Sequence, residues 1–345
     1  MTDTAQGSPE TQAAHTQPAQ VQGAPRPYAP SAVRDQFARV RTEVGKAVVG
    51  QDGAVTGLII ALLAGGHVLL EGVPGVAKTL LVRTLSRALQ LDTKRVQFTP
   101  DLMPGDVTGS LVYDAKLGEF DFRAGPVFTN ILLADEINRT PPKTQAALLE
   151  AMEERQVSVD GDTRALPVPF IVAATQNPIE YEGTYTLPEA QLDRFLLKLV
   201  LDVPERADEV EVLTRSAGGF NPRNLEAAGV AAVLDAAGLA AAQAEVALVG
   251  SSQDVIAYIV DLARSTRQSP SVKLGVSPRG TTALLSAAKA WAWLNGSTAI
   301  TPDHVQAMLL PVWRHRIQLR PEAELEGVSS DSILRSIMQQ VQVPI

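Results

Sequence analysis

Apolar residues in the first part of this chain recur at helical spacing. Large apolar side chains from Val33 to Val44 return every three or four positions, and a second such stretch runs from Val55 to Leu63. This spacing places the apolar side chains on one face of a helix. We therefore predict two helices, the first of which ends near Gly45.

Short, mostly apolar runs then alternate with helical patterns. The runs predict five strands, at Val68–Leu70, Arg95–Phe98, Ile131–Ala134, Phe170–Ala174 and Leu196–Val200. Helical spacing over Thr79–Leu89 and Lys143–Glu154 falls between them. Strands that are apolar on both faces and alternate with helices are typical of a parallel sheet covered by helices. The expected fold class is therefore α/β.

Two hairpins are expected to interrupt this alternation. Leu111–Tyr113 and Glu119–Phe122 flank Lys116-Leu117-Gly118. Val157–Val159 and Arg164–Leu166 flank the dipeptide Asp160-Gly161. Glycine in a short polar segment between two apolar runs favours a tight turn between antiparallel strands.

The chain divides into three parts by composition. Residues 1–30 are rich in Gln, Ala, Pro, Thr and Ser and contain almost no large apolar residue, so we expect a disordered tail. Residues 31–203 hold the alternating strands and helices and should form the αβα core. From 204 to 345 the strand patterns stop and only helical ones remain, which predicts a small all-helical lid domain.

Composition narrows the range of functions. A net charge of −8 disfavours a general binder of nucleic acid, and 5% aromatic residues disfavour stacking on single strands. The chain has no cysteine, and its four histidines lack the spacing of metal ligands. The sequence contains no apolar run long enough to predict a membrane-spanning helix, and its N-terminus lacks the basic-then-apolar layout of a secretory signal. We therefore expect a cytoplasmic protein.

A glycine-rich turn follows the first predicted strand and opens the next helix. It comprises Gly72, Val73, Pro74, Gly75, Val76, Ala77, Lys78, Thr79 and Leu80. Such a turn directs backbone N–H groups into one concavity at a helix N-terminus, where a triphosphate fits. Lys78 would reach the β- and γ-phosphates, and Thr79 would ligate Mg²⁺. Ala77 stands where the general pattern has glycine, and its small side chain fits if φ is negative there.

Two acids end the apolar run Ile131–Ala134. Buried acids are costly without partners, and the carboxyl end of a parallel strand is where a ligand binds. We expect Asp135 to hold Mg²⁺ through its water shell and Glu136 to polarise the attacking water. Either segment alone could be a turn that binds nothing. Together and in this order, they indicate a nucleoside triphosphatase.

Three further residues fit an ATPase that works at a subunit junction. Asn177 follows a predicted strand and could orient the attacking water, or it could simply form an Asn-Pro turn. Arg194 precedes the last strand and could reach a neighbour's γ-phosphate, or it could pair with Asp193 or Glu189. Arg279 begins a helix and could sense γ-phosphate from the lid side, or it could face water.

Taken jointly, these segments resemble the AAA+ ATPases, and more closely the MoxR family. The resemblance runs from about Ser31 to the C-terminus. It rests on Glu71–Thr79, Phe98–Pro104, Leu133–Arg139, Pro142–Glu150, Ala174–Pro178 and Glu189–Phe195.

The resemblance implies an ATP-hydrolysing ring, usually a hexamer, with ATP and Mg²⁺ at each interface. Similar proteins act as chaperones in maturation or metal-cofactor insertion, often with a partner that carries a von Willebrand factor A domain. The two hairpins match those that face the pore in related proteins.

The resemblance also assigns roles by position. Gly50 and Gln51 would lie near the adenine. The remaining roles are Walker A for Lys78 and Thr79, Walker B for Asp135 and Glu136, sensor 1 for Asn177, arginine finger for Arg194 and sensor 2 for Arg279. Arg123 and Arg139 could also reach across an interface.

Three alternative functions remain open from the sequence. The motor subunit of a metal chelatase shares this layout. A nucleotide-dependent switch with negligible turnover is disfavoured by the presence of Glu136, Asn177 and Arg194, and turnover would decide. A DNA helicase is disfavoured by the acidic balance, so nucleic acid is not an expected partner.

Overall fold

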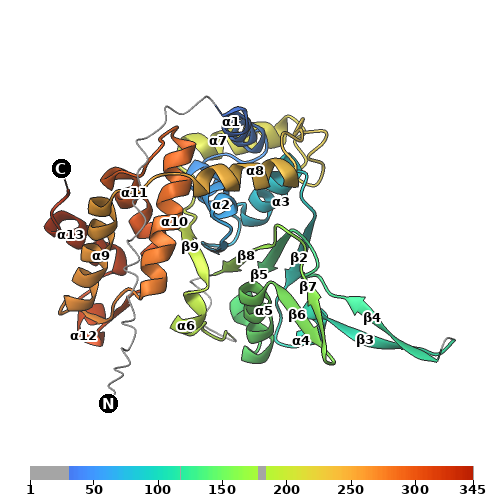
Figure 1. The fold of residues 1–345 in the computed structure, drawn as a ribbon. Coiled ribbons are helices and arrows are strands. Elements are labelled where there is room, and N and C mark those ends of the chain that lie inside the picture. Colours follow the sequence, from blue (N-terminus) through green and yellow to red (C-terminus); the bar gives the residue numbers. More distant parts are fainter. Residues whose placement is uncertain (1–30, 117, 178–183, 345) are drawn as a thin grey trace, which may run out of the picture.

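The computed structural model describes residues 31–116, 118–177 and 184–344, so the expected tail over residues 1–30, Leu117 and Pro178 lie outside the described part. Its centre is a five-stranded sheet in the order β2-β5-β8-β1-β9, in which all neighbours are parallel (Figure 1). The strands are β1 (His67–Glu71), β2 (Thr93–Gln97), β5 (Ile131–Asp135), β8 (Ile171–Gln176) and β9 (Phe195–Val200). The predicted α/β class is confirmed.

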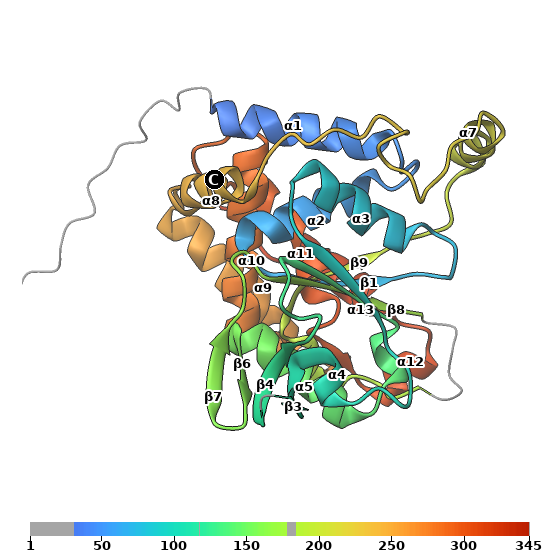
Figure 2. The ribbon, with the colours of Figure 1, turned by 90° about the vertical axis from the view of Figure 1, so that its right-hand side faces the viewer.

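Alternate residues of β1, β5 and β8 enter two different buried clusters. Val68 and Leu70 of β1 pack in one cluster, whereas Leu69 packs in the other. Helices α1 (Ala32–Gly45), α2 (Asp52–Ala64) and α3 (Lys78–Ala88) cover the first face, and α4 (Pro104–Thr108) and α5 (Pro142–Glu154) cover the second (Figure 2). Because both faces are covered, β1, β5 and β8 are mostly apolar, which is the pattern that predicted them.

Both expected hairpins are present. β3 (Gly109–Asp114) pairs with β4 (Glu119–Ala124), and β6 (Gln156–Val159) pairs with β7 (Asp162–Ala165), each antiparallel. Figure 1 shows the β3–β4 hairpin extending well away from the sheet. Two single turns complete this part, η1 (Ile137–Arg139) after β5 and α6 (Glu189–Leu192) before β9.

The region after β9 is mostly helical. Its helices are α7 (Arg206–Ala217), α8 (Ala236–Ala247), α9 (Gln253–Gln268), α10 (Pro278–Leu294), α11 (Pro302–Trp313), α12 (Pro321–Leu325) and α13 (Ser330–Gln340). The expectation that no strand follows Val203 is wrong in one detail, because β10 (Val272–Leu274) pairs with β11 (Gln318–Leu319). Three and two residues are too few for an alternating pattern to appear in the sequence.

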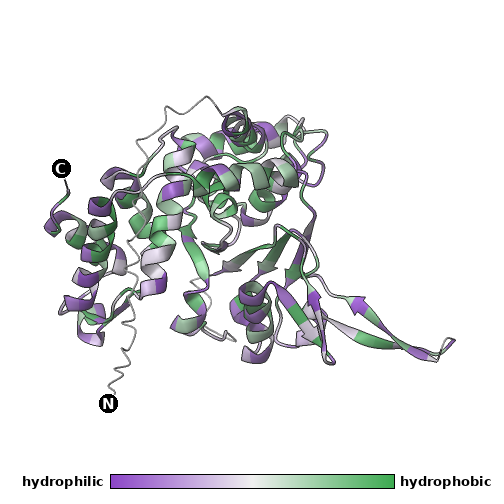
Figure 3. Ribbon diagram, viewed as in Figure 1, coloured by the Kyte–Doolittle hydropathy of each residue, from purple (hydrophilic) through white to green (hydrophobic). Residues whose placement is uncertain are grey.

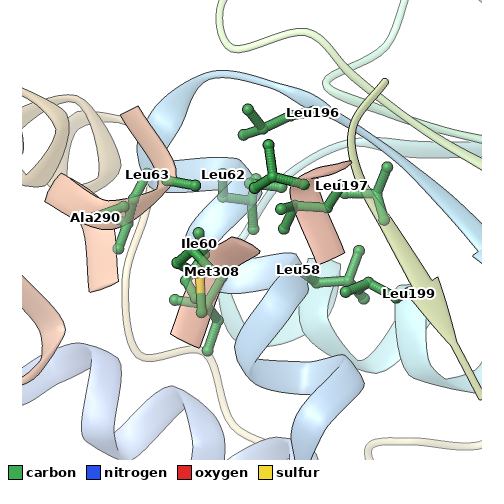
Figure 4. Packing of buried hydrophobic residues seen from close by; sticks show 14 of the residues in the cluster. Leu58, Ile60, Leu62, Leu63, Leu196, Leu197, Leu199, Ala290 and Met308 are labelled. Carbon is green, nitrogen blue, oxygen red and sulfur yellow. The ribbon is translucent and has the colours of Figure 1, made fainter. Parts of the chain in front are cut away.

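Helix α2 joins the sheet to the helical region. Its side chains Leu58, Ile60, Leu62 and Leu63 lie close to Leu196, Leu197 and Leu199 of β9, Ala290 of α10 and Met308 of α11 (Figure 4). Figure 3 shows α2 among the most uniformly hydrophobic elements, as expected for a helix surrounded by protein. The sheet and the helical region therefore share one continuous core. No helix in the described ranges is long and apolar enough to cross a bilayer.

This shared core gives a stability prediction. Leu62 is 2% exposed, and we expect Leu62→Ala to lower the free energy of unfolding by about 2–5 kcal/mol, since it leaves a cavity where three elements meet. Leu213→Ala on α7 is the control, because Leu213 is 69% exposed and its loss should cost less than about 0.5 kcal/mol. Urea unfolding followed by tryptophan fluorescence measures both. Equal losses in the two variants would contradict the shared core.

Candidate functional site

The glycine-rich loop and both acids lie at one edge of the sheet. β1, β5 and β8 are neighbouring parallel strands, so their carboxyl ends meet at the same edge. The loop follows β1, Asp135 ends β5 with Glu136 next, and the buried Asn177 follows β8. The structure therefore brings together segments that are spread along the sequence from Gly72 to Asn177, at the edge where ligands of open α/β sheets bind.

The loop is held tightly at its start and is open at its tip. A Cβ on Gly72 would lie 2.5 Å from the carbonyl oxygen of Leu201, so only glycine fits there without a shift. Gly75 has a φ of 93°, and a Cβ placed on it would have no other atom within 4 Å. Lys78 opens α3 and its Nζ donates to the Gly72 carbonyl oxygen at 2.5 Å. The lysine is thus folded across the loop.

The condition under which Ala77 would fit the loop without strain, a negative φ, is not met. The φ of Ala77 is 64°, in the left-handed region, where the residue caps the N-terminus of α3. This conformation costs an L-residue with a Cβ about 1–2 kcal/mol, which explains why the general pattern has glycine. Alanine carries this cost but avoids the further strain that a β-branched or bulky side chain would add.

Thr175 fixes both acids. Its hydroxyl donates to Asp135 Oδ1 at 2.5 Å and accepts the backbone N–H of Glu136 at 2.9 Å. Glu136 itself has a left-handed φ of 58°. One threonine on β8 therefore sets the direction in which the chain leaves β5. No sequence pattern indicates this role for Thr175, because a single threonine at the end of an apolar run gives no signal of its own.

Two polar residues of the edge strand β2 link the acids to each other. Arg95 donates to Asp135 Oδ2 from Nε at 3.0 Å and from Nη2 at 2.7 Å, and to Gln97 Oε1 at 2.8 Å. Gln97 Nε2 then donates to Glu136 Oε2 at 2.8 Å. Arg139, considered above as a residue that could reach across an interface, pairs with Glu136 of its own chain at 3.1 Å.

Arg194 and Arg279 lie together at the opposite end of the sheet. Arg194 Nε lies 2.6 Å from Glu153 Oε2, and Arg279 Nη1 lies 3.1 Å from Glu153 Oε1. Both arginines line a cavity of about 280 Å³ with Gly66 and His67, which mark the amino end of β1. The hydrogen bond from Arg194 is the main cause that lowers the pKa of Glu153.

This position separates Arg279 from its own loop. The sequence left two possibilities for Arg279, a γ-phosphate sensor on the lid side or a side chain that faces water. In the structure the loop follows the carboxyl end of β1, whereas Arg279 lies at the amino end. The alternative ion pairs suggested for Arg194, with Asp193 or Glu189, are replaced by the pair with Glu153. Asp193 pairs instead with the buried Arg316.

Comparison with known proteins places the chain in a family. A model of the ATPase family associated with various cellular activities (AAA) matches residues 67–197, and an AAA lid domain model matches residues 264–337. The chaperone MoxR1 of Mycobacterium tuberculosis is 40% identical over 88% of this chain and 81% of its own length. Protein MoxR of Methylorubrum extorquens is 35% identical over 90% of this chain and 96% of its own. The chain belongs to the MoxR family of AAA+ ATPases.

Two further similarities agree with this assignment. The uncharacterized protein YeaC of Bacillus subtilis is 49% identical over 88% of this chain and 93% of its own length. The crystal structure of a putative ATPase from Cytophaga hutchinsonii has a TM-score of 0.83 and 40% identity, covering 91% of this chain and 96% of that one. This MoxR-family protein is thus a nucleotide-binding enzyme that hydrolyses ATP.

A pocket lined by Gly50 and Gln51, the residues expected near the adenine, has room for a nucleoside. It measures about 590 Å³ and lies between Gly50 and Gln51 on one side and Trp291 and Met308 of the helical region on the other. Gln51 Nε2 donates to the Asp202 carbonyl oxygen at 3.0 Å, next to the residue that contacts Gly72. Arg314 also lines this pocket, a cation of the helical region that the sequence analysis did not single out.

The oxygen donors at this edge fit Mg²⁺ better than a metal that needs many protein ligands. Thr79 and Asp135 offer a hydroxyl and a carboxylate, and the described residues contain no group of three His, Cys, Asp or Glu side chains that could hold a metal. Mg²⁺ keeps several waters and binds through one or two protein oxygens plus phosphates. A sparse donor set therefore suits it.

The left-handed φ of Ala77 gives a prediction for nucleotide binding. We expect Ala77→Gly to bind a fluorescent ATP analogue like the parent, whereas Ala77→Val should bind at least about tenfold more weakly, because β-branched residues are strained at positive φ. The glycine variant is the matched control for changing this position. Equal binding by both variants would show that the loop does not keep this backbone geometry around the nucleotide.

Proposed function

We propose that this MoxR-family ATPase hydrolyses ATP between the subunits of a ring and uses the energy to remodel partner proteins. The observation that carries the proposal is the separation of Arg194 and Arg279 from the loop of their own chain. The two arginines lie at the end of the sheet opposite to their own loop. They can therefore reach only a γ-phosphate that a neighbouring subunit holds against that end. A closed ring gives every site such a neighbour.

Each residue then has a role in the reaction. Lys78 and the loop N–H groups bind the phosphates. Thr79 and Asp135 would hold Mg²⁺, which when bound neutralises part of the negative charge on the phosphate oxygens. Glu136 polarises the attacking water, and Asn177 orients it. Arg194 from the neighbour stabilises the charge that develops on the transferred group, with Arg279 beside it.

Remodelling is supported by the printed name of one relative and by the hairpins. The M. tuberculosis relative is a chaperone. The exposed β3–β4 hairpin carries Tyr113 and Phe120 with ring centroids 5.3 Å apart, an apolar surface that could contact a client. We propose a hexamer, a cytoplasmic location, a partner with a von Willebrand factor A domain, and protein maturation or metal-cofactor insertion as the process served. We also propose that residues 31–203 form the core and 204–345 the lid.

ATPase rate against protein concentration tests the ring. We expect the specific activity of the parent to rise with concentration, because each site needs a neighbour, and Arg194→Ala to reduce it by about 10³-fold or more. Arg335→Ala, which removes an exposed arginine from α13, is the control and should behave like the parent. A rate that does not depend on concentration and survives Arg194→Ala would mean that each chain has a self-contained site.

Two substitutions at the loop and the acids separate binding from chemistry. Lys78→Ala should lose ATP binding. Glu136→Gln should bind ATP but hydrolyse it about 10²–10⁴-fold more slowly, because the amide cannot accept a proton. Equilibrium nucleotide binding and single-turnover hydrolysis measure the two steps. Near-parent turnover in Glu136→Gln would remove Glu136 from this role, and negligible turnover in the parent would favour a nucleotide-dependent switch.

A further inference from the structure

A second pocket, rich in arginine, lies on the outer side of the loop helix. It measures about 790 Å³ and is bordered by α3, by β2 and by the segment 223–232 that follows α7. Arg87 Nε of α3 donates to the Val230 carbonyl oxygen of this segment at 2.9 Å, and Val233 N, directly after it, donates to the Ala88 carbonyl oxygen at 2.8 Å. Figure 1 shows the segment beside α3. The pocket is therefore bordered by elements of the fold.

The charge of this pocket is opposite to that of the whole chain. Its lining contains four arginines, Arg83, Arg87, Arg95 and Arg223, and a single acid, Glu226, whereas the chain carries a net charge of −8. Arg87 Nη2 lies 3.6 Å from Glu226 Oε2, and the Glu226 side chain is largely exposed. In the ranges that the structure describes, Arg83 and Arg223 form no ion pair. Guanidinium groups gathered in this way match an oxyanion with two or more oxygens.

One of the four arginines connects the pocket to the acids of the catalytic site. Arg95 faces the pocket and is bound to Asp135 Oδ2 by two hydrogen bonds of 3.0 and 2.7 Å. It also binds Gln97, whose amide donates to Glu136. A guanidinium this close to Asp135 offsets its negative charge and weakens the attraction of Asp135 for a divalent cation. An anion in the pocket would compete for Arg95 and return that charge to Asp135.

We infer that the pocket formed by Arg83, Arg87, Arg95 and Arg223 binds an oxyanion, and that its occupation lowers the Mg²⁺ concentration that the enzyme needs. The oxyanion is a free phosphate-type ion or a carboxylate from a second copy of the chain. Binding to the pocket does not depend on the proposed mechanism. The effect on Mg²⁺ rests on the proposed role of Asp135.

Calorimetric titration with sulfate tests the pocket directly. The Lys78→Ala chain is used at low protein concentration, so that the loop does not bind the ion and copies do not associate, with chloride at equal ionic strength as the blank. We expect the Lys78→Ala chain to bind sulfate at one site. Introducing Arg83→Ala and Arg223→Ala into that chain should weaken the affinity for sulfate at least about tenfold. Adding Arg264→Ala and Arg335→Ala removes two exposed arginines elsewhere and should leave binding unchanged. Equal binding in all variants would overturn the pocket.

The Mg²⁺ requirement of the ATPase tests the link to Asp135. With the Lys78 side chain intact, sulfate should lower the half-saturating free Mg²⁺ concentration by about fivefold, and the Arg83→Ala, Arg223→Ala chain should show no such shift. Arg95→Gln should have a low requirement without sulfate, and sulfate should change it no further. Sulfate binding without any shift in the Mg²⁺ requirement would overturn the link. An inactive parent would instead count against the proposed function and leave the calorimetric result standing.

Self-association distinguishes the two sources of the oxyanion. One outcome assigns the oxyanion to a carboxylate of a second copy. In that outcome sulfate does not bind the dilute chain, and sedimentation shows that the double variant Arg83→Ala, Arg223→Ala associates more weakly. The control variant Arg264→Ala, Arg335→Ala associates like the parent. If neither sulfate binding nor association depends on Arg83 and Arg223, the inference is wrong.

Discussion

Because the five strands of the sheet run parallel, their carboxyl ends share one edge and their amino ends the other. The glycine-rich loop, Asp135, Glu136 and Asn177 follow carboxyl ends and therefore meet, whereas Arg194 precedes β9 and lies at the far edge. The sheet thus places the glycine-rich loop and the acids at one end of the subunit, and Arg194 and Arg279 at the other. In the proposed ring, the amino edge of one copy would approach the carboxyl edge of another.

At both edges the charged groups already have internal partners. Lys78 donates to the Gly72 carbonyl, Arg95 holds Asp135, and Glu153 holds Arg194 and Arg279. The pairs of Arg194 and Arg279 with Glu153 are partly exposed, and such pairs contribute at most about 1 kcal/mol each, so exchanging them for another anion costs little free energy. The Arg95–Asp135 pair differs, because the Asp135 side chain is only 12% exposed. Arg95 therefore competes more strongly with a divalent cation for that carboxylate.

The sequence predicted those parts of the fold that depend on buried periodicity. β1, β5 and β8 are apolar on both faces, and the loop and the two acids follow directly from them, so their shared edge was foreseeable. Arg95 and Gln97 were not foreseeable, because polar residues on the edge strand β2 look the same whether they face solvent or a neighbouring acid. The φ of Ala77 was missed because the residue type alone does not fix the backbone at a helix start. The position of Arg279 depends on how α10 packs against α2, about 220 residues earlier, and no local pattern records that contact.

The attachment of the helical region involves more than apolar packing, and it concerns Arg194 directly. The buried Arg316, just after α11, donates from Nε to Asp193 Oδ1 at 2.6 Å and from Nη2 to the Phe195 carbonyl at 2.7 Å. His315 bonds the same carbonyl at 2.9 Å, and burial keeps its pKa well below the usual value, so the ring is neutral there near pH 7. These contacts flank Arg194 on both sides. A displacement of α11 against β9 must therefore either break several buried hydrogen bonds or carry Arg194 with it, and breaking them leaves a buried guanidinium without partners, which is the costlier outcome.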